Sequence, residues 1–253
     1  MRPIAIMAAM QEEMVGLTSA LSDARNINNG SRQFTTGTVH GQPVVLVLSR
    51  IGKVAAATTA TALVERFDVS AIVFTGVAGG LASGVNVGDM VVASEFIQHD
   101  MDASPLFAPL EIPLYGRAIF PTDPGLTQSL RAAAQGLLNN LSQWIDQDTL
   151  HALHALHVQS PKVHSGLVLS GDRFVSTSSE SQALQKRLPL ALAVEMEGAA
   201  VAQVCHDYGV PFAAVRTISD RADDHATIDF SRFIQEVASR YTSALIGAWM
   251  ASR

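Results

Sequence analysis

Several patterns that define large classes of protein are absent from this sequence. It has one cysteine, Cys205, which excludes an intramolecular disulfide. No run of lysine or arginine occurs and the formal net charge is -6, so nothing offers a basic surface to a nucleic-acid backbone. The apolar run at the N-terminus is too short for a signal-sequence core and far too short for a membrane span. We therefore expect a cytoplasmic protein with no nucleic-acid and no membrane partner.

What the sequence does contain is an alternation of apolar runs and helical patterns. Ala71–Thr75 and Phe212–Thr217 have the composition of buried strands, whereas Lys53–Phe67 and Ser231–Ala251 predict helices. Such alternation predicts an α/β fold with a mixed, mostly parallel twisted sheet flanked by helices. No repeat or linker interrupts the chain, so we expect residues 1–253 to form a single domain.

Two further segments complete this outline. The β-rich runs Gln33–Val39 and Pro43–Ser49 are separated by three residues and predict an antiparallel hairpin. Pro105–Pro124 follows no regular pattern, which is typical of a long connection that covers a site or an interface.

Acidic residues follow several of the predicted strands. Glu13 comes soon after the first, Glu195 and Glu197 stand at the end of another, and Asp220 follows the last. Ligands of α/β sheets bind beyond the carboxyl ends of the strands, so these carboxylates are candidates for acid-base chemistry. One of Glu195 and Glu197 is expected to cap the next helix, where negative charge is favoured, and the other to face the cleft, although spacing alone favours capping by both.

Other polar clusters have competing interpretations. Arg216 and Asp220 end the same strand, and a structural salt bridge is the alternative to a functional pair. The glycine-rich loop Thr75–Gly80 offers N–H groups to an anion, but it matches neither the dinucleotide fingerprint nor the P-loop. Arg50 and Lys53 open a helix, where cations either face an anion or are solvated.

Histidines suggest a metal at first sight. His151, His154 and His157 recur every three residues, but they alternate with leucines and are more typical of the polar edge of an amphipathic helix. The run His99–Asp102 is more typical of a loop cap. No Gly-x-Ser-x-Gly elbow is present, and Cys205 has no evident partner base, which disfavours covalent catalysis. We expect no metal and no cofactor.

Seven sequence blocks together form a recognisable series. They are AMQEEM at 9–14, SRIGKVAAA at 49–57, TGVAGGL at 75–81, HDMD at 99–102, SGDRF at 170–174, VEMEGAAVAQVCHDYGVPF at 194–212 and VRTISDRAD at 215–223. With these blocks, in this order and over nearly its whole length, the chain resembles the 5'-methylthioadenosine/S-adenosylhomocysteine nucleosidases of the purine nucleoside phosphorylase superfamily.

The resemblance implies a nucleoside phosphorylase-like fold and hydrolysis of the N-glycosidic bond of a 5'-substituted adenosine, with release of adenine. The implied partner is a small-molecule purine nucleoside. It also implies a homodimer in which the partner subunit completes the subsite for the 5' group. Formation of positive charge on the ribose during bond cleavage explains why carboxylates suit this reaction without a metal.

The resemblance also implies roles for individual residues. Glu13 would activate water, Glu197 would hold the ribose hydroxyls, and Asp220 would protonate purine N7. Arg216 would orient these acids. The residues that would contact substrate are Phe174, stacking on the purine, Val175, reading its edge through the backbone, Met196 and Phe230, packing against ribose and base, and Val77 and Ile51.

Departures from the family pattern keep two other functions open. Val77 stands where the family has serine or threonine, and Arg50 replaces the glycine of SGIGK. The stretch 137–163 is longer than the family norm, and 103–115, which borders the 5' subsite, is divergent. A phosphorylase is the first alternative, because Arg50 adds a cation near the expected site, although Val77 removes a donor. A nucleoside-binding sensor with reduced catalysis is the second.

Overall fold

All ten strands belong to one mixed sheet in the computed structural model, which describes every residue from Met1 to Arg253. The strands are β1 (Ile4–Ala8), β2 (Ser22–Asn29), β3 (Arg32–Val39), β4 (Gln42–Leu48), β5 (Ala71–Gly80), β6 (Met90–Gln98), β7 (Ile119–Pro121), β8 (Val163–Ser170), β9 (Ala191–Glu195) and β10 (Phe212–Asp220). The helices are α1 (Gln11–Ser19), α2 (Lys53–Phe67), α3 (Pro124–Asn139), α4 (Gln147–Ala155), α5 (Ser178–Arg187), α6 (Gly198–Tyr208), α7 (Ala226–Phe233) and α8 (Ser239–Ala251).

The strand order is β10-β6-β8-β9-β5-β1-β4-β3-β2, and β10 also pairs with β5. This extra pairing closes β5, β10, β6, β8 and β9 into a ring. Parallel pairings link β4 to β1, β1 to β5, β5 to β10, β6 to β8, and β8 to β9. The parallel arrangement brings the ends of β1, β5 and β10 to one edge, where the predicted acids lie.

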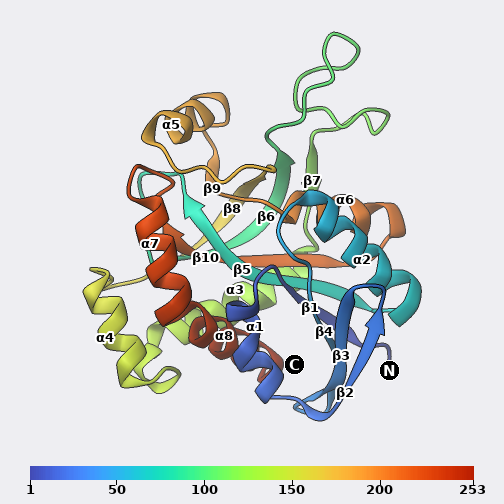
Figure 1. Ribbon diagram of the computed structural model, residues 1–253, viewed down its shortest axis with the longest axis vertical. Helices are drawn as coiled ribbons and strands as arrows, with labels where there is room; N and C mark the ends of the chain where they lie inside the picture. The colour runs from blue at the N-terminus through green and yellow to red at the C-terminus, as the bar shows by residue number, and fades with distance from the viewer.

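Helices cover both faces of the sheet (Figure 1). One apolar cluster joins α1, α3 and α8 to one face, through residues such as Met14, Leu130 and Trp249. The other joins α2 and α6 to the opposite face, through residues such as Leu63 and Cys205. Each face is therefore buried, which explains why the central strands are apolar throughout rather than alternating. None of the helices combines the length and apolar character needed to cross a membrane.

The structure confirms the α/β class and corrects several local predictions. The polar strand β2 was not predicted, and it extends the expected hairpin to three strands. The last helical region begins at Ala226 rather than Ser231 and runs through a π-helical stretch, Ile234–Ala238, into α8. The glycine-rich segment Thr75–Gly80 is not a loop, because β5 continues through it.

Predictions for two further segments are confirmed in part, because β7 lies within the predicted irregular stretch Pro105–Pro124 and His157 lies beyond the end of α4. The connection between β6 and β7 has almost no regular structure and extends away from the rest of the chain, at the top of Figure 1. In α4, Leu153 is buried and Leu150 and Leu156 pack against the core, whereas His151 and His154 are exposed. His151 and His154 therefore form the polar edge of an amphipathic helix.

Candidate active site

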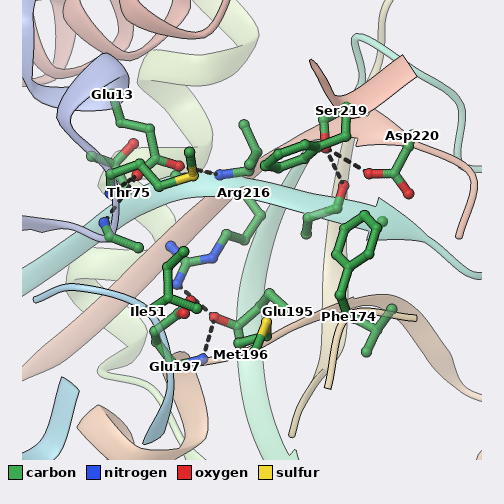
Figure 2. A pocket seen from close by; sticks show the side chains of 18 of the residues that line it. Glu13, Ile51, Thr75, Phe174, Glu195, Met196, Glu197, Arg216, Ser219 and Asp220 are labelled. Carbon is green, nitrogen blue, oxygen red and sulfur yellow. Dashed lines mark hydrogen bonds and ion pairs between the residues drawn. The ribbon is translucent and has the colours of Figure 1, made fainter. Parts of the chain in front are cut away.

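A cavity of about 490 Å³ opens beside the ends of β1, β5, β9 and β10, and helix α7 borders it. This volume is in the range of pockets that hold small organic ligands. The charged residues among those that line it are Glu13, Glu195, Glu197, Asp220 and Arg216. In the view of Figure 2, Glu13 and Asp220 lie on opposite sides of Arg216, and Glu195 and Glu197 lie below it.

Glu13 lies in the first turn of α1, and its side chain turns back on the start of that helix. One carboxylate oxygen accepts the N–H groups of Ala9 and Met10, each at 2.9 Å, and the other accepts that of Val77 at 3.0 Å. Only 1% of the residue is exposed, and burial raises its pKa, although the three N–H groups and Arg216 oppose this effect. The neighbouring Glu12 is exposed, so Glu13 is the acid that faces the cavity.

Glu195 and Glu197 accept hydrogen bonds from different parts of the chain. Glu195 accepts the N–H of Glu197 at 3.1 Å and that of Gly198 at 2.8 Å, and so caps the N-terminus of α6. Glu197 accepts the N–H of Gly52 at 3.0 Å, from a distant loop. Burial, followed by the charge of Glu195, raises the pKa of Glu197. Glu195 is therefore the capping acid, as expected of one of the two, but both carboxylates line the cavity.

Arg216 is buried among these acids and pairs with only one of them. Its Nη2 lies 2.8 Å from Glu195 Oε2, and its guanidinium group lies 4.1 Å from the ring centre of Phe74. The interpretation of Arg216 and Asp220 as a salt bridge is wrong, because the cation reaches across to β9 instead. Arg216 is the only cation lining the cavity, and it is already paired with Glu195.

Asp220 ends β10 at a bulge, where the pairing of β10 with β5 shifts by one residue between Ile218 and Asp220. Its carboxylate accepts the Oγ–H of Ser219 and the N–H of Ala222, each at 2.8 Å. Burial raises the pKa of Asp220 from 3.8 to about 6, despite these two donors. An aspartic acid with this pKa can donate a proton near neutral pH.

The glycines of β5 make room for two of these carboxylates. A Cβ on Gly76 would lie 2.9 Å from Glu13 Oε1, and a Cβ on Gly79 would lie 2.9 Å from Asp220 Oδ1. Both distances are shorter than side chains tolerate. The small glycines therefore leave space for the carboxyl groups of Glu13 and Asp220, and the segment does not surround a bound anion. The N–H of Val77 is donated to Glu13.

An aromatic pair borders the other side of the cavity. The rings of Phe174 and Phe230 have centroids 5.5 Å apart and an interplanar angle of 64°. Phe174 remains 42% exposed, so part of its ring surface is free to contact a ligand (Figure 2). The cavity thus has four acids, one cation that is already paired, and an exposed aromatic ring. These groups suit a neutral aromatic ligand that develops positive charge during a reaction.

Comparison with known proteins agrees with this geometry. Residues 3–248 match the model of the phosphorylase superfamily. The 5'-methylthioadenosine/S-adenosylhomocysteine nucleosidase of Anoxybacillus flavithermus is 35% identical over 236 residues, which are 93% of this chain and 92% of that protein. The chain belongs to this nucleosidase family.

Solved structures extend the similarity to the whole fold. The Neisseria meningitidis nucleosidase, in complex with methylthio-immucillin-A, has a TM-score of 0.86 and 31% identity, with 100% of both chains covered. The S. pneumoniae nucleosidase, with a transition-state inhibitor, has a TM-score of 0.82 and 31% identity, covering 99% of this chain and 100% of that one. The expectation of a nucleoside phosphorylase-like fold is confirmed.

The structure gathers the residues expected from the nucleosidase family around one cavity, with one exception. Those lining it are Glu13, Ile51, Val77, Phe174, Met196, Glu197, Arg216, Asp220 and Phe230. Val175 is the exception, because its side chain is buried in a separate apolar cluster. Its predicted contact used the backbone, so the prediction stands without support from side-chain placement.

Arg50, the cation that departs from the nucleosidase pattern, points away from the cavity. Its Nη2 donates to the carbonyl oxygen of Ser31 at 2.6 Å, and the residue is not among those lining the site. It has a φ of 65°, in the left-handed region that suits the glycine of the family pattern. The expectation that Arg50 lies near the site as a possible anion ligand is therefore wrong.

Sequence reasoning missed several residues at the site. Thr227 and Ser231 line the cavity together with Phe230, one helical turn apart on α7. They were missed because the helix was predicted to begin only at Ser231. No group of three or more His, Cys, Asp or Glu side chains in the structure is arranged to hold a metal ion.

Proposed function

We propose that this protein hydrolyses the N-glycosidic bond of 5'-methylthioadenosine, S-adenosylhomocysteine or a related 5'-substituted adenosine and releases adenine. One observation carries the proposal. Glu13 and Asp220 are both buried, both have raised pKa values, and both open on the same cavity. An acid for the leaving base and a base for water are the two groups that the reaction requires. Nucleosidase relatives with bound nucleoside analogues support it.

In the proposed reaction, Asp220 donates its proton to N7 of the purine while the bond between C1' and N9 breaks. The bonding electrons leave with the purine, which departs as neutral adenine. Burial of Asp220 favours its protonated form, and Ser219 and Ala222 hold the carboxyl group in place. We assign Phe174 to stacking on the purine, with Phe230 and Met196 packing against base and ribose and the backbone of Val175 at the purine edge.

Water completes the reaction by adding to C1', and Glu13 takes the proton that the water loses. Its three backbone N–H donors fix the carboxylate, and its raised pKa makes it a better base than an exposed glutamate. Glu197 is assigned to the ribose hydroxyls, where its negative charge would stabilise the cationic sugar. Arg216 keeps Glu195 in position beside Glu197.

Phosphate is disfavoured as the attacking group. The cavity is lined by four acids, and its only cation, Arg216, is committed to Glu195. A phosphate dianion would meet negative charge with no free cation to compensate it. Because Arg50 is turned away, the observation that favoured a phosphorylase is lost.

The deciding experiment incubates purified protein with 5'-methylthioadenosine, S-adenosylhomocysteine, adenosine and inosine, with and without phosphate, and identifies the sugar product. We expect adenine and the free sugar from the 5'-thio substrates, at the same rate with and without phosphate. A sugar 1-phosphate would establish a phosphorylase instead. Tight binding without turnover would establish a sensor.

We further propose that residues 1–253 act as one domain in a cytoplasmic homodimer, with the partner subunit completing the 5' end of the pocket. Large apolar side chains lie exposed in the first turn of α2 and on the projecting connection: Val54 is 75% exposed, Leu106 83% and Leu114 91%. Exposed apolar surface favours contact with another protein. Light scattering across a concentration series tests this, and a monomer at every concentration would contradict it.

A further inference from the structure

Lys53 occupies an unfavourable place for a cation. It is the first residue of α2, where the helix dipole repels positive charge, and α2 has no side-chain cap of its own. Its side chain is nevertheless only 15% exposed, so it is not a solvated surface lysine. Something other than helix stability must account for the position of this lysine.

Two aspartates from distant segments hold Lys53. Its Nζ lies 2.6 Å from Asp100 Oδ1, and its backbone N–H donates to Asp172 Oδ1 at 2.7 Å. The aspartates are themselves joined, because the N–H of Asp172 donates to Asp100 Oδ2 at 2.9 Å. We call Lys53, Asp100 and Asp172 the clamp. It ties the start of α2 to the segment after β6 and to the segment after β8.

Each end of the clamp adjoins a residue of the cavity. Gly52, next to Lys53, donates its N–H to Glu197 Oε1 at 3.0 Å. Asp172 is two residues before Phe174, whose ring borders the cavity. The packing between these ends is tight, since a Cβ on Gly52 would lie 3.1 Å from Asp172 Oδ1. The clamp therefore fixes the only backbone donor to Glu197 relative to the aromatic wall.

We propose that Lys53, Asp100 and Asp172 are positioning residues for the nucleosidase reaction, which set Glu197 against the ribose and Phe174 against the purine. None of the three lines the cavity, so they act through Gly52 and Phe174. This inference rests on the proposed function. A shift of about 1 Å in a positioning group is enough to reduce turnover by up to about 100-fold.

The state of Asp100 agrees with this role. Burial alone would raise the pKa of Asp100, but its hydrogen bonds to Lys53 and to the N–H of Asp172 bring it below its ordinary value. Asp100 is thus ionised while it is paired with Lys53.

The clamp is also linked to the helix that follows Glu197. Lys53 Nζ donates to Gln98 Oε1 at 3.2 Å, and Gln98 in turn donates to Gln203 Oε1 on α6 at 2.8 Å.

Kinetics of four variants test the proposal: Lys53→Met, Asp100→Asn, the double variant of both, and Lys53→Arg as the conservative replacement. With 5'-methylthioadenosine we expect each of the first two to lower kcat about 10- to 100-fold, with a smaller change in KM. The double variant should be no worse than the worse single variant, because both break one unit. Lys53→Arg should recover most of the loss, since arginine can still pair with Asp100. Lys186→Met, at an exposed position on α5, is the matched control and should retain wild-type rates.

Hydrogen exchange of the same variants separates positioning from folding. We expect faster exchange in peptides covering 49–56 and 171–176, with an unchanged melting temperature for the core. Faster exchange there with unchanged kcat would overturn the proposal, and so would equal losses for Lys53→Arg and Lys53→Met. If the wild-type protein does not turn over 5'-methylthioadenosine, the proposed function fails separately. Calorimetric binding of 5'-methylthioadenosine then decides the clamp: about tenfold weaker binding by Lys53→Met supports it, and equal binding overturns it.

Discussion

Two regions of this molecule gather ionisable side chains, and they hold them in different ways. Around the cavity, Glu13, Glu197 and Asp220 come from separate elements, are buried, and each accepts at least one backbone N–H. On α4, His151 and His154 come from one helix and remain in solvent. Both regions attract notice in the sequence, but only in the first are the side chains withdrawn from water. Convergence from distant elements, rather than spacing within one, distinguishes the site.

The sharpest test of this contrast is Asp220→Asn. The amide retains the shape of the side chain but has no acidic proton to give the purine, so we expect turnover of 5'-methylthioadenosine to fall by about 1000-fold. Adenine release followed by absorbance measures it. Asp68→Asn, at an exposed position, serves as the control and should keep wild-type activity. Substantial turnover by Asp220→Asn would remove Asp220 from the role of general acid.

The pH dependence of the wild-type protein tests the same residue without a mutation. Because the pKa of Asp220 is about 6 and its acid form is required, kcat/KM should fall about tenfold per pH unit well above pH 6. A profile that stays flat from pH 6 to pH 9 would contradict the assignment.

The same pKa has a consequence for stability. A carboxyl group with a pKa raised from 3.8 to about 6 contributes to folding below pH 3.8, and that contribution is lost as the pH rises through 6. Asp220→Asn should therefore be more stable than wild type well above pH 6, by on the order of 3 kcal/mol, and equal to it below pH 3.8. Urea unfolding at the two pH values measures the difference, and an equal difference at both would refute it.

A smaller effect is expected from Gly79→Ala. The added Cβ would approach Asp220 Oδ1 and the Cβ of Ala222, so the carboxyl group must move. We expect kcat to fall about tenfold with little change in melting temperature. At Gly84 an added Cβ meets nothing within 4 Å, so Gly84→Ala is the matched control. If the two alanine variants are equally active, the glycines of β5 do not serve to admit the acids.

The smallest effects are expected at the exposed histidines of α4. His151→Ala and His154→Ala should leave turnover unchanged and alter the free energy of unfolding by less than about 0.5 kcal/mol, since both side chains are exposed. Steady-state kinetics and urea unfolding check both values. A loss of activity would mean that α4 takes part in the function, and the two regions would then not differ in this respect.

The sequence predicted the central elements and the acids at the strand ends, because apolar strands and the positions of Glu13 and Asp220 are local features. It did not predict partners that depend on how strands pair. Arg216 reaches Glu195 because β10 and β9 both pair with β5, which no spacing within the sequence reveals. Strand β2 was not predicted because nearly all of its residues are exposed, so its sequence shows no alternation of apolar and polar residues.

That polar strand has a consequence of its own. The ring formed by β5, β10, β6, β8 and β9 leaves those strands paired on both sides, so the free edges of the sheet are at β2 and β7. A free edge can recruit the strand of another molecule and begin aggregation. Here one edge, β2, is hydrophilic and carries Asp23 and Arg25, and the other, β7, is three residues long and ends in Pro121. The residues that hide β2 from a search for apolar periodicity also protect the protein from edge-to-edge association.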